Sequence, residues 1–270
     1  MAKTIAVANQ KGGVGKTTTT INLAASFANM NRRVLLIDLD PQGNATVGSG
    51  VDKGQITHTI SHALLNEIEI HQAIIKLAKS YDVVPTNNEL IVAEVQLLQE
   101  PQRELRLKKI LEQVRTHYDY ILIDCPPSLN ILTVNALVAS DSVLIPIQCE
   151  YFALEGLSAL LSTVEQVQST INADLRIEGL LRTMYDGRNR LALDVSAQLL
   201  AHFPDRVYRT VIPRNVRLAE APSHGMPVIQ YDEKSLGALA YLALAGEMLR
   251  REEAAVDRRV AAVLEKDYIT

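Results

Sequence analysis

The sequence predicts an α/β fold, with a mostly parallel, twisted sheet and helices on both of its faces. Short aliphatic runs alternate with segments of helical period, and this alternation is typical of βαβ units. The runs are continuously apolar, as expected for strands buried on both faces of a parallel sheet. Hydrophobic residues make up 47% of the 270 residues, enough for a large core. We therefore expect a single domain over residues 1–270.

The expected elements follow one another along the whole chain. Strands are predicted at residues 5–8, 34–38, 81–85, 120–124, 142–147, 177–183 and 207–212. Helices are predicted at residues 18–29, 89–99, 104–117, 130–139, 154–169 and 191–202, and one or two more between about 235 and 266, packed on the domain. Residues 47–66 read as a loop, where His58 and His62 are interpreted as surface histidines rather than metal ligands.

A glycine-rich loop joins the first expected strand to the first helix, which is the context of a phosphate-binding P-loop. Glycines permit unusual dihedral angles, so backbone N–H groups there and at the helix start can converge on phosphate. In this interpretation Lys16 reaches the β- and γ-phosphates and the Thr17 hydroxyl binds Mg²⁺. The standard motif has a glycine where this chain has Gln10. The predicted ATP-binding residues of the loop are Lys11, Gly12, Gly13, Val14, Gly15, Lys16, Thr17 and Thr18.

Carboxylates follow two of the other expected strands. Asp38 and Asp40 lie at the end of one strand, and Asp124 ends another, just before Cys125 and two prolines. The carboxyl ends of parallel strands border the crevice in which α/β folds bind ligands. Asp124 is therefore expected to hold Mg²⁺, directly or through water. Asp38 and Asp40 are two residues apart at the end of the strand, and they need not point the same way.

Composition restricts the remaining functions. The net charge is −4, so a nucleic-acid surface must be a local patch. Residues 176–217 contain eight arginines and no lysine against four acidic residues, a local charge of +4. Arginine suits phosphate contacts, and such contacts give salt-dependent binding without base readout. Two cysteines, Cys125 and Cys149, make neither a disulfide framework nor a zinc site, and no apolar run approaches a membrane span.

Several stretches together resemble the ParA/Soj group of P-loop ATPases, which is related to MinD and to the nitrogenase iron protein. They are the deviant loop Lys-Gly-Gly-Val-Gly-Lys-Thr with its extra lysine, Asp-Leu-Asp-Pro-Gln-Gly-Asn from Asp38, and residues 212–225. The resemblance covers nearly the whole chain. It implies a Mg²⁺-dependent ATP hydrolase in which Lys11, Lys16 and Asp40 are catalytic.

The resemblance also implies individual roles. The residue matching Lys11 reaches across an ATP-bound sandwich dimer to the partner's phosphates. The residue matching Asp40 positions or activates the attacking water, while Asp38 lies beside the magnesium with Thr17 and Asp124. Pro213 and Asn215 match residues that contact adenine, and Met184 is expected to line the same slot.

The family's function is implied in the same way. The ATP-bound dimer binds double-stranded DNA without sequence preference, and a ParB-type partner stimulates hydrolysis, which releases the DNA. The resemblance selects Arg188, Arg217 and Lys234 as DNA contacts, with Arg190 as a weaker candidate. It implies a cytoplasmic, nucleoid-associated protein of chromosome or plasmid partitioning that does not bind membrane.

Three alternatives accompany this interpretation. A MinD-like membrane ATPase would end in a helix with a large apolar face and a basic one, whereas residues 250–264 mix acids with arginines around Ala and Val. A relative of the nitrogenase iron protein would need cysteines placed to share a cluster across a dimer, and Cys125 directly follows Asp124. A ParA-like ATPase that positions another cargo is not distinguished by the sequence.

Overall fold

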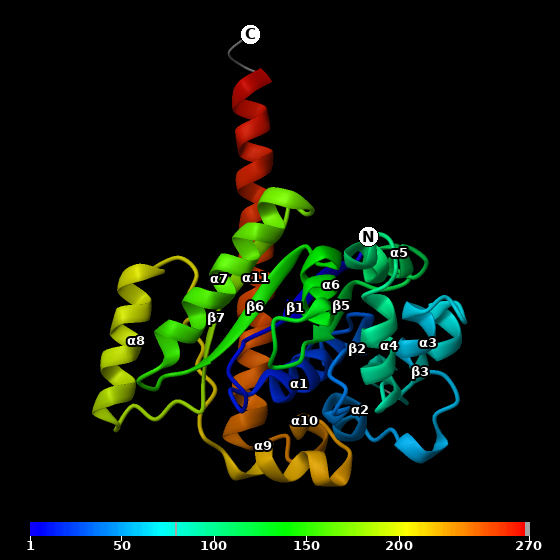
Figure 1. The fold of residues 1–270 in the computed structure, drawn as a ribbon. Coiled ribbons are helices and arrows are strands. Elements are labelled where there is room, and N and C mark those ends of the chain that lie inside the picture. The colour runs from blue at the N-terminus through cyan, green and yellow to red at the C-terminus, as the bar shows by residue number, and fades with distance from the viewer. Residues whose placement is uncertain (79, 268–270) are drawn as a thin grey trace.

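A seven-stranded sheet forms the centre of the computed structural model (Figure 1). The structure describes residues 1–78 and 80–267, and it describes their side chains up to Asp257. The strand order is β3-β4-β2-β5-β1-β6-β7. Every neighbouring pair is parallel except β3 and β4. The strands are β1 (Lys3–Val7), β2 (Val34–Asp38), β3 (Ile75–Lys76), β4 (Asp82–Val84), β5 (Tyr120–Asp124), β6 (Ser142–Gln148) and β7 (Arg176–Thr183).

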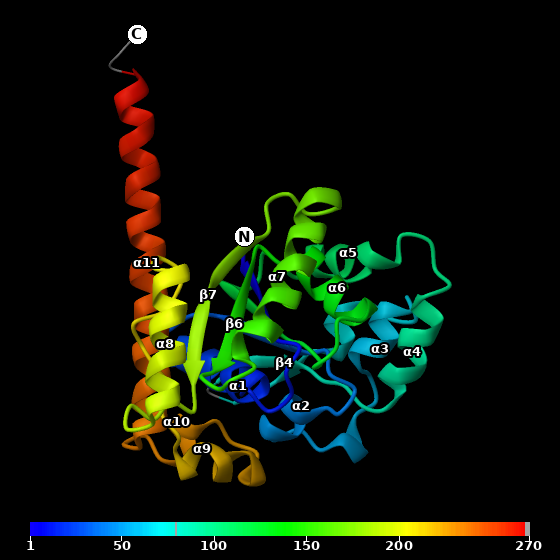
Figure 2. The same cartoon turned by 60° about the vertical axis from the view of Figure 1, so that its left-hand side comes forward.

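Helices connect the strands and cover both faces of the sheet. Figure 2 shows α6 and α7 on one side of the sheet and α11 on the other. The helices are α1 (Lys16–Asn29), α2 (Asn44–Gly48), α3 (Ile60–Leu64), α4 (Glu89–Leu97), α5 (Arg106–Glu112), α6 (Ile131–Ala139), α7 (Ala153–Thr170), α8 (Arg190–His202), α9 (Val216–Glu220), α10 (Val228–Tyr231) and α11 (Leu236–Asp267). Short 3₁₀ turns lie at Lys53–Gln55, Ile70–Ala73, Arg103–Leu105 and Ala221–His224. The expected α/β class is confirmed.

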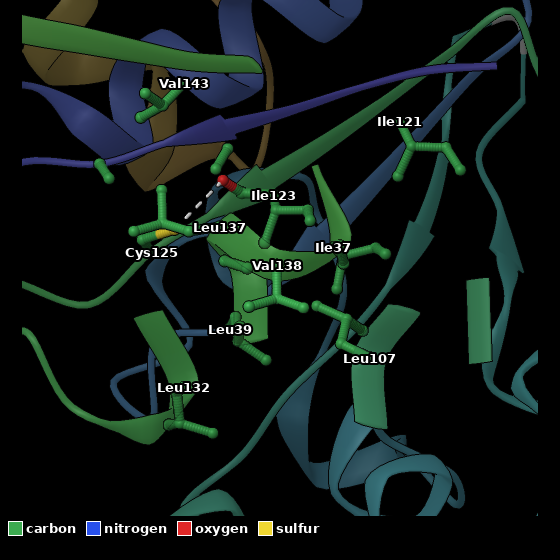
Figure 3. Packing of buried hydrophobic residues seen from close by; sticks show 14 of the residues in the cluster. Ile37, Leu39, Leu107, Ile121, Ile123, Cys125, Leu132, Leu137, Val138 and Val143 are labelled. Atoms are coloured by element: carbon green, nitrogen blue, oxygen red, sulfur yellow. Dashed lines mark hydrogen bonds between the residues drawn. The ribbon is translucent and has the colours of Figure 1, made fainter. Parts of the chain in front are cut away.

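Two hydrophobic cores lie on opposite faces of the sheet. In β2, Leu35 and Ile37 belong to one core while Val34 and Leu36 belong to the other, because successive side chains of a strand point to opposite faces. The first core contains side chains from α3 to α8, and the second is built largely by α1 and α11. Figure 3 shows part of the first core, in which β-strand side chains meet α5 and α6. Since both faces are covered, the strands read as continuous aliphatic runs.

The prediction of a strand at residues 207–212 is wrong. The segment makes only isolated parallel bridges, Leu180 with Val207 and Tyr185 with Pro213, beside the edge strand β7. Side chains take several of its backbone groups. Glu247 accepts from the N–H groups of Arg209 and Thr210, and Arg182 donates to the carbonyls of Tyr208 and Arg209. These side-chain bonds interrupt the ladder, so only some backbone groups of the segment bond to β7, as the Tyr208 and Ile212 N–H groups do.

Two other regions differ from the expected elements. Residues 47–66 contain the end of α2, a 3₁₀ turn and α3 rather than only loop. His58 and His62 there are half-buried, with ring centroids 6.0 Å apart in an edge-to-face contact. The Nδ1 atom of His62 lies 2.9 Å from the Thr59 hydroxyl at the start of α3, so this histidine caps a helix. No cluster of three or more metal-ligating side chains occurs among the residues that the structure describes.

The helix α11 begins against α1 and then runs past the edge of the sheet (Figures 1 and 2). Its first half is held by Tyr241, Leu244 and Met248, which are buried in the second core. Further along, Glu252 pairs with Lys3 and accepts from the Tyr120 hydroxyl, 2.5 Å away. Residues 236–267 thus form one long helix. Within residues 1–78 and 80–267, no helix is long and apolar enough to cross a membrane.

Candidate functional site

The loop between β1 and α1 has the geometry that a phosphate cradle requires. Gly13 and Gly15 have φ angles of +73° and +90°, a region that side chains strongly disfavour. Gly15 occupies the N-cap position of α1, and no side chain caps that helix or places an acid in its first turn. The first N–H groups of α1 therefore remain available to an anion, and the helix dipole favours negative charge there.

Neighbouring segments fix the shape of the loop. The Thr183 hydroxyl, at the end of β7, donates to the carbonyl of Val14 at 2.7 Å. The Lys16 ammonium lies 3.3 Å from the carbonyl of Lys11, so its side chain folds back over the loop. Lys16 is only 7% exposed, and burial lowers its pKa although Asp124 opposes this. Among the described residues no carboxylate lies at ion-pair distance from Lys16, and a buried ammonium of this kind is suited to bind a multiply charged anion.

The two strands that end in carboxylates lie side by side. In the register of β2 and β5, Asp38 is directly opposite Asp124, and both residues are completely buried. Asp124 accepts from the hydroxyls of Thr17 and Thr20 at 2.8 and 3.0 Å. Asp38 accepts from both the N–H and the hydroxyl of Thr46 at 2.7 Å. The sequence analysis named Thr17, but it missed the threonines at positions 20 and 46.

Burial strongly perturbs this pair. Desolvation raises the pKa of Asp38 and of Asp124, and for Asp124 the nearby charge of Asp38 raises it further. The threonine hydrogen bonds oppose these shifts without cancelling them. In the described part of the chain, neither carboxylate has a lysine or arginine within ion-pair distance. Two buried carboxylates without a cation strongly favour binding of one.

The donor set fits magnesium. Two carboxylates and the Thr17 hydroxyl are hard oxygen ligands of the kind that Mg²⁺ takes together with water and phosphate oxygens. Asp40 lies beside them, is 8% exposed, and accepts from the N–H of Gln42 at 3.0 Å. Its own N–H donates to Asp38 at 3.2 Å, so the turn after β2 holds both side chains.

The Lys11 side chain is partly exposed and leaves the loop to meet Glu150. Its ammonium is bonded to the Glu150 carboxylate at 2.5 Å, and its N–H donates to the Asn9 side chain at 2.9 Å. Both charged side chains are partly exposed, 35% for Lys11 and 45% for Glu150. Sequence reasoning missed Glu150 because it is 139 residues away from Lys11 along the chain.

The residues matched to adenine contacts lie near the carboxyl end of β7. Pro213 forms an isolated β-bridge with Tyr185. Met184, which precedes Tyr185, has a φ of +47°, which is rare for a non-glycine residue. The Asn215 side chain accepts from the N–H of Arg217 and caps α9. This capping bond is a structural function for Asn215, and its amide nitrogen has no hydrogen-bond partner among the described residues.

The three matched DNA contacts are all exposed. Arg188 is 91% exposed and bonds to Asp186, whose pKa is lowered to about 2 mainly by that bond. Arg217 pairs with Glu220 at 2.8 Å and with Asp232 at 3.2 Å. Lys234, which is two residues after Asp232, lines a surface hollow of about 390 Å³ between α1, α10 and α11. Arg188 and Arg217 are therefore both ion-paired with carboxylates of this chain.

The cysteines have no catalytic geometry. Cys125 is completely buried in the first core, where burial raises the pKa of its thiol, and its Sγ approaches the carbonyl of Ile123 at 3.8 Å (Figure 3). Cys149 is also buried, and its pKa is raised for the same reason. Both are interpreted as core thiols, because a reactive cysteine has a lowered pKa and partial exposure.

Comparison with known proteins agrees with this geometry. Residues 2–177 match the family model described as an AAA domain. The sporulation initiation inhibitor protein Soj of Bacillus subtilis is 54% identical over 92% of this chain and 98% of its own length. The chromosome partitioning protein ParA of Myxococcus xanthus is 50% identical over 97% of this chain and 93% of its own.

The chain belongs to the ParA/Soj family of chromosome-partitioning P-loop ATPases. A solved structure that is 36% identical has the same arrangement, with a TM-score of 0.84 over 94% of this chain and 97% of that one. It is described as cobyrinic acid a,c-diamide synthase from Mycobacterium smegmatis with bound ATP analog and magnesium. The predicted ATPase class and the resemblance to ParA and Soj are thus confirmed.

Proposed function

We propose that this ParA/Soj-family ATPase is a DNA-partitioning switch whose ATP-bound dimer binds double-stranded DNA without sequence preference. A ParB-type partner stimulates hydrolysis in this proposal, and the dimer then releases DNA. The main supporting observation is that the nucleotide-binding loop and the proposed DNA-binding arginines are connected through the same strand, β7. The nucleotide loop contacts the end of β7 through Thr183, and the exposed arginines follow β7 and the segment beside it. We also propose that residues 1–270 act as one ATPase domain.

Within this proposal, residues of the glycine-rich loop bind ATP. Lys16 holds the β- and γ-phosphates, and Thr17, Asp38 and Asp124 hold Mg²⁺, directly or through water. The open N-terminus of α1 and the two buried carboxylates without a cation support these roles. When bound, Mg²⁺ would neutralise charge that develops on the phosphates during transfer. Pro213 and Asn215 are proposed to contact the adenine.

Asp40 is proposed to orient the attacking water. It lies at the same strand end as Asp38 and is held by the N–H of Gln42, so one of its carboxylate oxygens has a fixed direction. Lys11 is proposed to contact phosphate from the partner subunit of an ATP-bound sandwich dimer. The Lys11 side chain is partly exposed, which suits contact with a second subunit. Asp40→Ala is expected to retain ATP binding and to lose hydrolysis.

The proposed DNA surface is built by residues that the fold brings together. Arg217 on α9 reaches Asp232, which is two residues before Lys234. Arg214 acts electrostatically on Asp186, the partner of Arg188. Arg217 is thus close to the segment of Lys234, and Arg214 is close to Asp186, the partner of Arg188, so Arg214 is added to the proposed surface. Because Asp186, Glu220 and Asp232 accompany these arginines, DNA phosphate must compete with them, and we expect strong salt dependence.

Fluorescence anisotropy with a random-sequence duplex tests the proposal. We expect binding with ATP, weakened by salt, and little binding with ADP or without nucleotide. Arg217→Glu should abolish DNA binding and retain ATP binding. Arg206→Glu is the matched control, because Arg206 is exposed in the same basic stretch and its side chain has no bond to Arg188, Arg217 or Lys234 or to their acidic partners in the described part of the chain. Absence of binding in every nucleotide state would refute DNA as the partner.

Location and cargo follow from the same proposal. Binding to non-specific DNA would place the protein on the nucleoid in the cytoplasm, and the cargo would be a chromosome or plasmid that carries the ParB-type partner. A ParA-like ATPase that positions another cargo would share the biochemistry and differ in that partner. A MinD-like ATPase would instead bind liposomes with ATP, and co-sedimentation with vesicles of anionic phospholipid separates the two. We expect no such sedimentation.

A further inference from the structure

The ion pair between Lys11 and Glu150 joins the nucleotide loop to the turn after β6. The ammonium and the carboxylate are 2.5 Å apart, which is a short, charge-assisted hydrogen bond. Neither side chain makes another side-chain contact with an opposite charge within the residues that the structure describes. Lys11 therefore has one counter-charge, and it belongs to the same chain.

The sheet holds both partners in place. β1 and β6 are adjacent and parallel, with Val7 opposite Leu144, so the segments that follow them leave the sheet together. The buried Asn9 side chain donates to the carbonyl of Pro146 in β6 at 2.7 Å and accepts from the N–H of Lys11. The Glu150 N–H donates to Gln148, and its carbonyl accepts from Ala153 at the start of α7. The two charges thus meet because of the fold.

We propose that Glu150 is a positioning residue that holds Lys11 in the nucleotide-free chain and competes with nucleotide phosphate for its ammonium. An ammonium bonded to a carboxylate must leave it before it bonds to a phosphate, whichever subunit supplies that phosphate. Glu150 thereby weakens nucleotide binding and keeps Lys11 ordered until nucleotide arrives. This inference rests on the proposed phosphate contact of Lys11.

The expected size of the effect is moderate. Partly exposed ion pairs are weak, and removal of such a competitor changes an equilibrium by about two- to fivefold. The Glu150 carboxylate could also repel phosphate directly, without any role for Lys11. The two explanations differ in one respect, since direct repulsion persists after Lys11 is removed and competition does not.

Nucleotide titrations on the full chain separate the two explanations. A fluorescent ATP analogue with Mg²⁺ is titrated into the wild type, Glu150→Gln, Lys11→Ala and the double variant. We expect Glu150→Gln to tighten binding about two- to fivefold, Lys11→Ala to weaken it, and Glu150→Gln to have no effect in the Lys11→Ala background. Glu155→Gln is the matched control, because Glu155 is exposed in the first turn of α7 and has no bond to Lys11.

A second measurement tests, without nucleotide, whether the ion pair with Glu150 restrains the Lys11 ammonium. The rate at which an N-hydroxysuccinimide ester acylates Lys11, followed by mass spectrometry, should rise severalfold in Glu150→Gln and stay unchanged in Glu155→Gln. An equal effect of Glu150→Gln on nucleotide affinity in both Lys11 backgrounds, or an unchanged acylation rate, would overturn the inference. If Lys11→Ala leaves affinity unchanged while acylation responds to Glu150, the proposed phosphate contact is wrong, and the competition fails with it.

Discussion

Charged side chains lie at both ends of the sheet, but the partly buried cluster around Lys3 at one end is paired with opposite charge, whereas among the described residues the fully buried Asp38 and Asp124 at the other end are not. At the amino end of the strands, Lys3 bonds to Glu178 at 2.9 Å and also to Glu252. At the carboxyl end, Asp38 and Asp124 are completely buried and receive only neutral hydrogen bonds. Neither aspartate has a cationic side chain at ion-pair distance in the parts of the chain that are described.

The difference separates a structural cluster from a binding site. Burying a charge is unfavourable, and an opposite charge with good hydrogen bonds compensates for it. The cluster around Lys3 meets this condition and thereby attaches α11 to β1 and β7. The aspartates do not meet it, and their raised pKa values reflect the remaining cost. An external cation removes that cost, so the same physics that stabilises one end creates affinity at the other.

The largest expected effect is on catalysis, at the carboxyl end. Lys16→Ala should lower the hydrolysis rate by about 10²–10³-fold, because it removes a buried positive charge at the phosphates. The free energy of unfolding should change little, since the ammonium has no carboxylate partner and is already desolvated. ATPase assays and urea unfolding measure the two quantities. A large loss of stability in this variant would contradict the contrast between the two ends.

The opposite result is expected at the amino end. Lys3→Met should lower the free energy of unfolding by about 2 kcal/mol, because it leaves Glu178 and Glu252 without their cation. The hydrolysis rate per folded molecule should remain that of the wild type. Lys76→Met is the control, because Lys76 is exposed on the short edge strand β3. Equal stability of the two variants would show that the cluster is not structural.

The pH dependence of stability sharpens the comparison at Glu247 of α11. Burial opposes its ionisation, but bonds from Thr210, Arg209 and Arg251 outweigh burial and lower its pKa. A carboxyl group whose pKa is lower in the folded chain contributes stability above its unfolded pKa of about 4.3, and this contribution is lost as the pH falls through the folded value.

Glu247→Gln should therefore cost about 1–2 kcal/mol of unfolding free energy at pH 7, and the difference from wild type should shrink below pH 4. Urea unfolding at several pH values, with Glu253→Gln as an exposed control on the same helix, tests this. A difference that stays constant down to pH 3 would mean that the carboxylate charge contributes nothing.

The smallest expected effect concerns a neutral bond at the carboxyl end. Thr183→Val removes the hydroxyl that donates to Val14 and should lower the free energy of unfolding by about 1 kcal/mol. Nucleotide affinity should also fall, since the loop loses one of its supports. Thr163→Val removes a similar bond on the surface of α7 and should leave affinity unchanged. If both variants bind nucleotide like the wild type, Thr183 has no part in shaping the loop.

Local pattern was enough to predict a large part of this molecule. The glycine-rich loop, the aliphatic strands and the carboxylates that end two of them are short-range features, because dihedral freedom and burial on both faces act on neighbouring residues. The strand at 207–212 was mispredicted because side chains of Glu247 and Arg182 take several of the backbone groups that a regular ladder would use, and only isolated backbone bonds to β7 remain.

The α/β class, the phosphate loop and the identity of the acidic residues could all be predicted from residue patterns. Which charges are paired became known only from the folded chain. Strand order places Asp38 opposite Asp124, Glu150 against Lys11, and Lys3 between Glu178 and Glu252. Pairing depends on distance and burial, and both are set by the register of strands that are far apart in the chain, so no local pattern of residues contains them.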